Sequence, residues 1–419
     1  MPNFSIPLSG LFATNQALAN ISNNLANLNT TGYKDSTVNF QDMFYQMLGS
    51  NGSGDQLQVG SGTGISSVST NFSGGSVQST GVNTNVAISG GGFFVVQDGN
   101  STYYTRAGDF TRDSNGNLVT ADGMQVMGYP AANGSIVTSG GLTPIQIQDG
   151  MINPPKPTST VSLQANLSAS AAVGDSYSAN VTMYDSLGTS HVLNVDFTRT
   201  ASGWSYNATL PSSDLVGGAT TGNTTVASGN LAFDGSGNLT PASLAAVTIK
   251  IPNTSPVVPA FADGASSQSI TWNLADSSGK GLITQVAGDS STTSATQDGY
   301  SSGTLTDFAI NSDGTVVGSF TNGTKVLGQI ALANFANLEG LSKVGDNNYA
   351  VTMSSGTATV GAPGSGSLGT LTGSALELSN VDMSTEFSNL IIAERGFQAN
   401  AKSVTTFDQI AQDTINLIR

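Results

Sequence analysis

Few segments of the chain have the residue types and spacing that catalysis or metal binding would need. Residues 299–303 match the G-x-S-x-G pattern of a serine nucleophile, but His191, the single histidine, precedes this serine instead of following it as the hydrolase order requires. Residues 113–117 resemble the start of a calcium loop, yet Leu118 stands where the sharp turn needs glycine. We therefore expect a surface loop at the first segment, a β-turn at the second, and an ordinary strand residue at His191.

The composition excludes several classes of function. The chain has 419 residues with 51 glycines, and only 9% of its residues are charged. Its 12 basic and 27 acidic residues give a net charge of -15, which argues against non-specific nucleic-acid binding. The absence of cysteine excludes disulfides and thiolate metal sites. We predict no cofactor, no metal and no catalytic residue; a carboxylate-based glycosidase stays open, although no carboxylate pair stands out.

The sequence gives no sign of a membrane segment. No run of about 18 apolar residues occurs, so no transmembrane helix is expected. The N-terminus lacks the basic and continuous apolar regions of a cleaved signal peptide. We therefore expect no membrane insertion, and any export should use a route without a cleaved leader.

The N-terminal segment, residues 1–33, contains no charged side chain, yet its apolar residues recur with helical spacing. The spacing predicts a helix from about residue 7 to 29 with two seams seven residues apart. The seam residues are Leu11, Leu18 and Leu25, with Ile21 and Leu28 as companions. Asparagine is a poor helix former and no ion pairs support this segment, so we expect it to form when it packs against another segment or chain. A packed helix of a globular core is the alternative.

The C-terminal segment shows the same period over five heptads and predicts a helix from about 381 to 417. One seam is Met383, Leu390, Phe397, Val404, Ala411 and Ile418. A second seam is Phe387, Ala401 and Ile415, interrupted by Glu394 and Asp408. Ser379 or Asn380 could cap the start of this helix. Heptad helices at both ends of the chain suggest that the termini pair with each other as a coiled coil.

The middle of the chain carries strand and hairpin signals throughout, so the predicted fold is mainly β with helical ends. Dense Gly and Ser stretches and a Pro-rich stretch suggest the boundaries. They divide the chain into an N-terminal helix, 1–33; a Gly/Ser-rich connector, 34–74; a split β-domain, 75–150 and 297–360; an inserted outer β-domain, 151–296; a linker, 361–378; and a C-terminal helix, 379–419.

Four segments together resemble the bacterial flagellar rod and hook proteins. Residues 21–34 read ISNNLANLNTTGYK, which resembles the N-terminal signature of that family. The other matches, in family order, are AI at 87–88 with GGGFFVV at 90–96, YTRAGDF at 104–110, and SNVD at 379–382 with AERGFQANA at 393–401. The family-motif residues on these segments are Asn23, Asn24, Asn27, Gly32, Gly92, Phe93, Phe94, Arg106, Gly108 and Phe110.

The added β-domain resembles the hook branch of this family more than its shorter rod branch. The resemblance implies a subunit that polymerises with itself into a tube, with the terminal helices as an inner layer around an export channel. It implies a flexible joint that carries torque from rod to filament, and export by the flagellar type III route to the cell exterior. The implied partners are the distal rod protein, the hook–filament junction protein, the hook cap and the hook-length ruler. A distal rod subunit and a non-flagellar surface adhesin are the alternatives.

Overall fold

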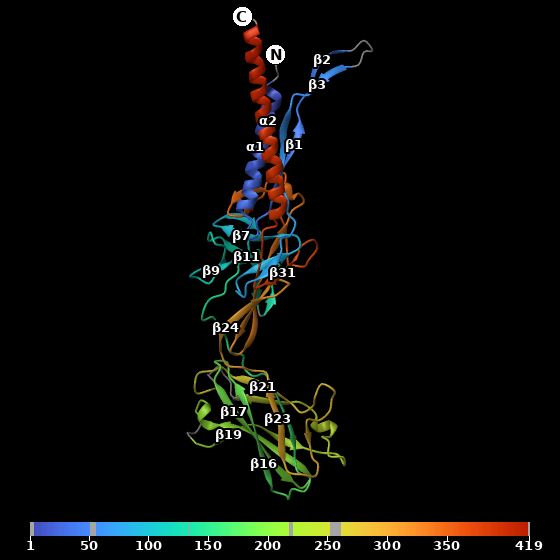
Figure 1. Ribbon diagram of the computed structural model, residues 1–419. Helices are drawn as coiled ribbons and strands as arrows, with labels where there is room; N and C mark the ends of the chain where they lie inside the picture. The colour runs from blue at the N-terminus through green and yellow to red at the C-terminus, as the bar shows by residue number, and fades with distance from the viewer. Residues whose placement is uncertain (1–3, 51–55, 133, 218–220, 252–260, 418–419) are drawn as a thin grey trace. The chain divides into compact units, whose positions relative to one another are not determined.

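The computed structural model describes residues 4–50, 56–132, 134–217, 221–251 and 261–417. The chain divides into two compact units. The first unit comprises Met1–Asp149, Asp307–Ser319 and Lys325–Arg419, and the second comprises Gly150–Thr306 and Phe320–Thr324. Both units are built from β-strands, and the first also carries a helix from each end of the chain, as Figure 1 shows. The predicted mainly β fold with helical ends is therefore confirmed.

The two helices, α1 (Ser5–Ala26) and α2 (Met383–Leu417), lie side by side in the first unit (Figure 1). They run antiparallel, because residues later in α1 contact residues earlier in α2. These contacts are Phe4–Phe407, Gly10–Asn400, Thr14–Gly396 and Asn24–Glu386. The predicted pairing of the termini is thus confirmed, and among the described residues neither helix is both long and apolar enough to cross a membrane.

The helix ends differ from the predicted ones. Helix α1 stops at Ala26, because Asn27 turns back with its amide on the Asn23 carbonyl at 2.9 Å, so Leu28 lies beyond the helix. Helix α2 begins after Asp382, whose Oδ1 accepts the Thr385 N–H at 2.7 Å. This bond lowers the pKa of Asp382. The N-cap is therefore Asp382, not the predicted Ser379 or Asn380.

The strands of the first unit pair early segments of the chain with late ones. Its central sheet has the order β26-β11-β7-β8-β29-β28. Smaller pairs are β1–β4, β2–β3, β31–β6 and β32–β5. The bounds are β1 (Ser36–Asp42), β2 (Gln46–Ser50), β3 (Gln56–Val59), β4 (Thr63–Thr70), β5 (Val77–Ser79), β6 (Val86–Ser89), β7 (Phe93–Asp98), β8 (Ser101–Thr105), β9 (Thr111–Arg112), β10 (Leu118–Val119), β11 (Gln125–Ala132), β12 (Ser135–Ile136), β13 (Thr143–Pro144), β27 (Leu332–Asn334), β28 (Ser342–Gly345), β29 (Asn348–Ala350), β30 (Thr359–Gly361), β31 (Thr370–Gly373) and β32 (Ala375–Glu377). Three strands include residues of both units: β24 (Gly303–Ile310), β25 (Thr315–Phe320) and β26 (Gly323–Ile330).

The second unit packs two sheets around one apolar core. One sheet has the order β20-β21-β15-β22 with β23 on β15, and the other has the order β16-β17-β18-β19. Alternate residues of β17 are buried, as expected for a strand with one covered face. Trp204 and Trp272 are both 1% exposed in this core. The bounds are β14 (Ile152–Asn153), β15 (Thr160–Asn166), β16 (Ser176–Tyr184), β17 (Ser190–Thr200), β18 (Gly203–Pro211), β19 (Asn223–Leu231), β20 (Val247–Ile251), β21 (Gln268–Asn273), β22 (Ile283–Thr284) and β23 (Ser291–Gln297).

One five-residue turn, Asp-x-x-Gly-x, recurs in both units. In each copy the aspartate Oδ1 accepts the backbone N–H groups two and four residues further on, at 2.8–2.9 Å. The turns begin at Asp113, Asp185, Asp234 and Asp276. Glycine at the fourth position takes a positive φ, 79° at Gly116, which other residues rarely adopt. The turn predicted at 113–117 is therefore present, held by hydrogen bonds within the protein.

The predicted connector and linker contain strands. Residues 34–74 form β1 to β4, with Val38 opposite Val68 across the β1–β4 pair. Residues 361–378 include β31 and β32, which pair with β6 and β5. The Gly and Ser content suggested chains without regular structure. The short apolar alternation within them, together with a distant partner strand, is sufficient for pairing.

Candidate assembly site

The contact between α1 and α2 is close, and small and polar side chains take part in it. A Cβ atom added at Gly10 would lie 2.7 Å from the Asn400 Nδ2, so the lack of a side chain at Gly10 lets Asn400 approach α1 this closely. Gly396 similarly faces the methyl group of Thr14. Small and uncharged side chains therefore set the spacing of the helices, in keeping with the uncharged N-terminal segment.

Most of the apolar surface of the two helices faces solvent. Among the described residues, α2 buries only Glu386, and α1 buries only Pro7, Ala13, Ile21 and Asn24. The large apolar side chains that remain exposed are Ile6, Leu8, Phe12, Met383, Phe387, Ile391, Ile392, Phe397, Ile410, Ile415 and Leu417. An apolar surface of this kind marks a site for contact with another chain.

The predicted seam residues occupy two different environments. Ile21 is buried, and those half-buried are Leu11, Leu18, Leu25, Leu28, Leu390, Ala401 and Val404. Phe387, Phe397 and Ile415 are exposed, and Ile418 lies outside the described residues.

The companion seam of α2 lies one residue earlier in the sequence than predicted. Glu386, Asn400 and Phe407, at multiples of seven residues, contact α1 or the residue before it. A search for apolar positions passes over this seam, because two of its members are polar. The uncharged amides and small residues of α1 accept them.

Asn24 joins α1, the following loop and α2. Its side chain is fully buried; Nδ2 donates to the Ser36 carbonyl at 2.8 Å, and Oδ1 accepts the Ser36 N–H and the Tyr33 hydroxyl, each at 3.1 Å. Nδ2 also lies 3.3 Å from the Glu386 Oε1. Burial raises the pKa of Glu386, and the contact with Asn24 opposes that shift. These bonds give the motif asparagine a structural reason, since an apolar residue would leave several buried groups unpaired.

The buried ionic junction, which we define as Lys34, Arg106 and Glu377, lies below the helix pair. The Glu377 carboxylate accepts hydrogen bonds from the Lys34 Nζ at 2.6 Å and from the Arg106 Nη1 at 3.2 Å. All three side chains are at most 2% exposed. The Gly75 N–H also donates to Glu377 at 2.9 Å. Burial lowers the pKa of Lys34, and the bond to Glu377 opposes that shift. The junction thus ties two motif-bearing segments and the backbone at Gly75 to one carboxylate.

Sequence reasoning missed Glu377, which it placed in a linker. The Gly32 N–H donates to the Glu377 carbonyl at 2.8 Å, so the end of α1 is held by the backbone of β32 as well. Gly32 has a φ of 68°, and a Cβ there would lie 2.6 Å from the Arg106 carbonyl carbon. A Cβ at Gly108 would lie 1.7 Å from the Val86 oxygen. Both motif glycines are therefore required by close backbone approach.

The aromatic residues of the motifs form core. Phe93 and Phe94 are fully buried, and Phe94 packs edge-on against Phe110 with ring centroids 4.9 Å apart. The Arg106 guanidinium lies 5.4 Å from the Phe93 ring centre. Tyr349 packs on Phe93 as well, and burial raises its pKa to about 12. Gly92 precedes Phe93 with a positive φ against Leu368.

The remaining motif asparagines cap the end of α1. The Asn23 Nδ2 donates to the Tyr33 hydroxyl at 3.1 Å, and the Asn27 Oδ1 accepts the Thr30 hydroxyl at 3.0 Å. Asn27 has no partner on α2 among its described hydrogen bonds. The motif therefore shapes the turn that leaves the helix.

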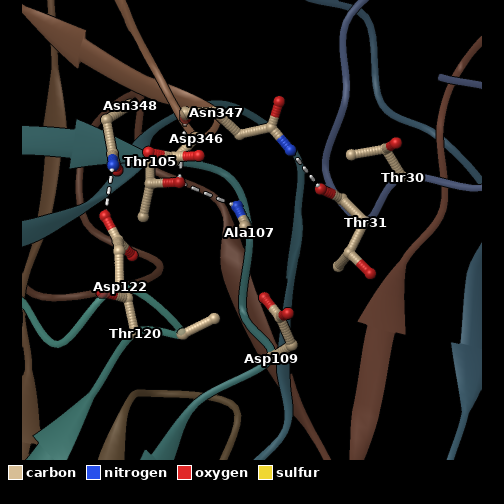
Figure 2. A pocket seen from close by; sticks show the side chains of 11 residues that line it. Thr30, Thr31, Thr105, Ala107, Asp109, Thr120, Asp122, Asp346, Asn347 and Asn348 are labelled. Atoms are coloured by element: carbon tan, nitrogen blue, oxygen red, sulfur yellow. Dashed lines mark hydrogen bonds between the residues drawn. The ribbon is translucent and has the colours of Figure 1, made fainter.

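A polar cavity of about 370 Å³ lies where this turn meets the strands (Figure 2). The Asn347 amide donates to the Thr31 carbonyl at 2.9 Å, and the Asn348 amide donates to Asp122 at 2.9 Å. Figure 2 shows the Asp109 carboxylate across the cavity from these bonds. The first bond fastens the turn after α1 to the residue before β29, and the second fastens β29 to Asp122, which are structural roles.

An apolar groove of about 390 Å³ lies between α1, β1 and α2. Its lining includes Ile21, Val38, Phe40 and Ile392, with Glu386 at one side. The groove extends the exposed apolar surface of the helices onto β1.

Four family models match the chain over residues 6–34, 87–300 and 372–417. They are the Flagella basal body rod protein (residues 6–34), the Flagellar hook protein FlgE/F/G D1 domain (87–166), the Flagellar basal body protein FlaE D2 domain (156–300) and the Flagellar basal body rod FlgEFG protein C-terminal (372–417). The helix pair, the junction below it and these matches define a flagellar rod or hook subunit.

Relatives that match over nearly their full length identify which branch of this class the chain resembles. The chain is 38% identical to the flagellar hook protein FlgE of Escherichia coli K12 over 99% of both chains, and 39% identical to that of Salmonella typhimurium over 99% of this chain and all of the relative. It is 34% identical to that of Treponema pallidum over 95% of this chain and 96% of the relative. The chain belongs to the flagellar hook protein FlgE family. The crystal structure of Helicobacter pylori FlgE2 aligns at a TM-score of 0.49 and 16% identity, over 70% of this chain and 98% of that one.

Proposed function

We propose that this chain is a structural, non-enzymatic subunit that polymerises through its terminal helices into the flagellar hook. In this role it forms a flexible tube that transmits torque from rod to filament around an axial export channel. The observation that carries the proposal is the apolar surface of α1 and α2, which the described residues leave exposed. Identical subunits joined by heterologous, non-closing contacts build a filament. Relatives named as hook proteins over the full length favour the hook above the distal rod.

The two environments of the seam residues suggest two roles in assembly. The half-buried set, with Ile21, holds α1 and α2 of one subunit together. The exposed Phe387, Phe397 and Ile415 are proposed to contact neighbouring subunits. Helix α1 carries no charged side chain, which limits the desolvation cost on its side when such a layer closes.

The proposed domain assignment keeps the boundaries suggested by the sequence. Residues 1–33 and 379–419 form the inner layer, residues 75–150 and 297–360 form the split domain around it, and residues 151–296 form an outer domain. The separate core of the second unit supports an outer domain that folds on its own. The strands in 34–74 and 361–378 make these segments structured connectors.

The proposed partners are further copies of the chain, the distal rod protein, the hook–filament junction protein, the hook cap and the hook-length ruler. The proposed location is the cell exterior, in the hook and basal body, after export without a cleaved leader. Neither nucleic acid nor membrane is a proposed partner.

A single substitution on the exposed surface tests the assembly role. Ile392 is 69% exposed on α2, and Val173 is 71% exposed in the second unit. We expect Ile392→Asn to leave the thermal unfolding of the monomer unchanged and to reduce tube formation in polymerising salt, as measured by sedimentation and electron microscopy. Val173→Asn is the matched control and should assemble as the parent does. Normal tubes from Ile392→Asn would contradict the proposal.

A further inference from the structure

The single histidine of the chain lies in a cluster of carboxylates in the second unit. His191, in β17, is 5% exposed, and its ring stacks on Phe261 at 4.5 Å. Its Nδ1 lies 2.9 Å from the Asp214 Oδ2, and its Nε2 lies 3.2 Å from the Asp185 Oδ2. Asp185 is fully buried. Both ring nitrogens therefore face a carboxylate oxygen.

A neutral imidazole ring does not satisfy both carboxylates, so this arrangement needs an added positive charge. A neutral imidazole carries one N–H group, so it can donate to only one of the two carboxylates. If Nδ1–H donates to Asp214, the lone pair of Nε2 faces the lone pairs of Asp185. Such a contact between buried acceptors is repulsive unless a second proton or a metal ion lies between them.

A third carboxylate, that of Asp263, points to the metal ion. Ligand atoms of Asp185, His191 and Asp263 all lie within 4.8 Å of one another, and they come from a turn, a strand and a separate loop. Asp263 is exposed, so an ion can reach the cluster and this side chain can move toward it.

We propose that Asp185, His191 Nε2 and Asp263 bind a divalent cation of the Zn²⁺ type, with Asp214 as a positioning residue on Nδ1–H. A carboxylate on the second ring nitrogen is the usual arrangement behind a histidine ligand, because it fixes the tautomer and the ring orientation. One imidazole and two carboxylates suit Zn²⁺ better than Mg²⁺, which prefers oxygen alone. The ion would tie the Asp185 turn, β17 and the Asp263 loop together and stabilise the second unit.

The test is a calorimetric titration of the untagged full-length monomer with ZnCl₂ after chelator treatment, with MgCl₂ as the comparison ion. The chain has no cysteine and one histidine, so background Zn²⁺ binding is low. We expect one Zn²⁺ per chain and a higher melting temperature, with no saturable Mg²⁺ binding. Asp263→Asn and His191→Gln should abolish Zn²⁺ binding, and Asp214→Asn should weaken it by about 10- to 100-fold. Asp289→Asn, an exposed carboxylate of the same unit, is the control and should bind as the parent does.

Two results would overturn the proposal. One is the absence of saturable Zn²⁺ binding to the parent chain, and the other is binding that Asp263→Asn leaves unchanged. Asp263 is exposed, so its variant should fold even where His191→Gln does not. The ¹⁵N signals of the single imidazole give a second readout: one protonated nitrogen in the presence of Zn²⁺ supports the site, whereas two protonated nitrogens show that a second proton fills this role.

Discussion

The core of the second unit and the terminal helix pair solve the problem of apolar surface in opposite ways. In the second unit, Trp204, Trp272 and Phe197 are at most 1% exposed, and both sheets cover them. In the helix pair, Phe12 is 68% exposed and Ile392 is 69% exposed, while Glu386 is the one residue that α2 buries among those described. The first region is complete within one chain, whereas the second leaves large apolar side chains exposed.

This contrast teaches where each region obtains its stability. An internal core stabilises the monomer directly, whereas an exposed apolar face contributes only when another molecule covers it. The helix pair is held meanwhile by Asn24 and by the junction of Lys34, Arg106 and Glu377. Changes to the core should therefore act on folding, and changes to the outer helix faces should act on assembly.

The largest expected effect is in the second unit. Phe197→Ala should lower its free energy of unfolding by about 3–5 kcal/mol, since a fully buried ring is replaced by a cavity. Both tryptophans of the chain lie in this unit, so tryptophan fluorescence during urea unfolding reports on it alone. Val192→Ala, on the same strand but 43% exposed, is the control and should change little. A small effect of Phe197→Ala would break the comparison.

Loss of the shared carboxylate should have the next largest effect. Glu377→Gln leaves Lys34 and Arg106 buried without a counter-charge, which should cost the first unit about 3 kcal/mol. The expected result is an earlier calorimetric transition with an unchanged tryptophan transition. Asp149→Asn, which removes the exposed partner of Arg112, should cost at most about 1 kcal/mol. Equal effects of the two variants would mean that burial does not determine the strength of these pairs.

A smaller effect is expected from the polar interior of the helix pair. Asn24→Ala removes the partners of Ser36 and Tyr33 and should lower stability by about 1–3 kcal/mol. Asn15→Ala, at an exposed position of the same helix, should stay within about 0.5 kcal/mol of the parent. Helical circular dichroism during thermal unfolding measures both. If the two variants behaved alike, the buried asparagine would not hold the pair.

Lowering the pH should destabilise the second unit and stabilise the helix pair. These effects are expected to be the smallest. Burial acts to raise the pKa of Asp298, but hydrogen bonds from Ser159, Thr160 and Lys156 hold it well below its ordinary value. Its contribution is therefore present above about pH 4 and is lost as pH falls through the folded-state value. The pKa of Glu386 is raised by burial, so its contribution is present below about pH 4 and is lost as pH rises through the folded-state value.

Two variants separate these responses. Asp298→Asn should flatten the acid dependence of the tryptophan transition below about pH 4. Glu386→Gln mimics the protonated acid and should stabilise the helix pair at pH 7 by circular dichroism. A helix pair that weakens in Glu386→Gln at neutral pH would show that the charge of Glu386 is needed there.

The sequence predicted what repeats locally and missed what depends on distant partners. The seam of Leu390, Val404 and Ala411 follows from spacing alone. The seam with Glu386 and Asn400 does not, because its side chains are polar and only the small, uncharged face of α1 makes them suitable. The family motifs identified Arg106, but Glu377 sits 343 positions from Lys34, and no local pattern marks it.

The same distinction explains the errors in the connectors. Turns such as Asp113 to Asn117 are encoded within five residues and were expected correctly. Strand β4 was not expected, because its residues Thr63–Thr70 are mostly small and polar, and its pairing with β1 becomes visible only in three dimensions. His191 was taken as an ordinary strand residue, since Asp214 and Asp263 reach it from other segments.

The sequence separation between the contacting residues of α1 and α2 determines the order in which the chain can fold. Asn24 and Glu386 lie 362 positions apart, so their contact closes nearly the whole polypeptide into one loop. The Asp-x-x-Gly-x turns close within five residues and form early, because short loops cost little entropy. Helix α1 emerges first from the ribosome but has to wait for the final segment before it can pair. A subunit therefore acquires its adhesive helical surface only in its last folding step, after its β-domains are complete.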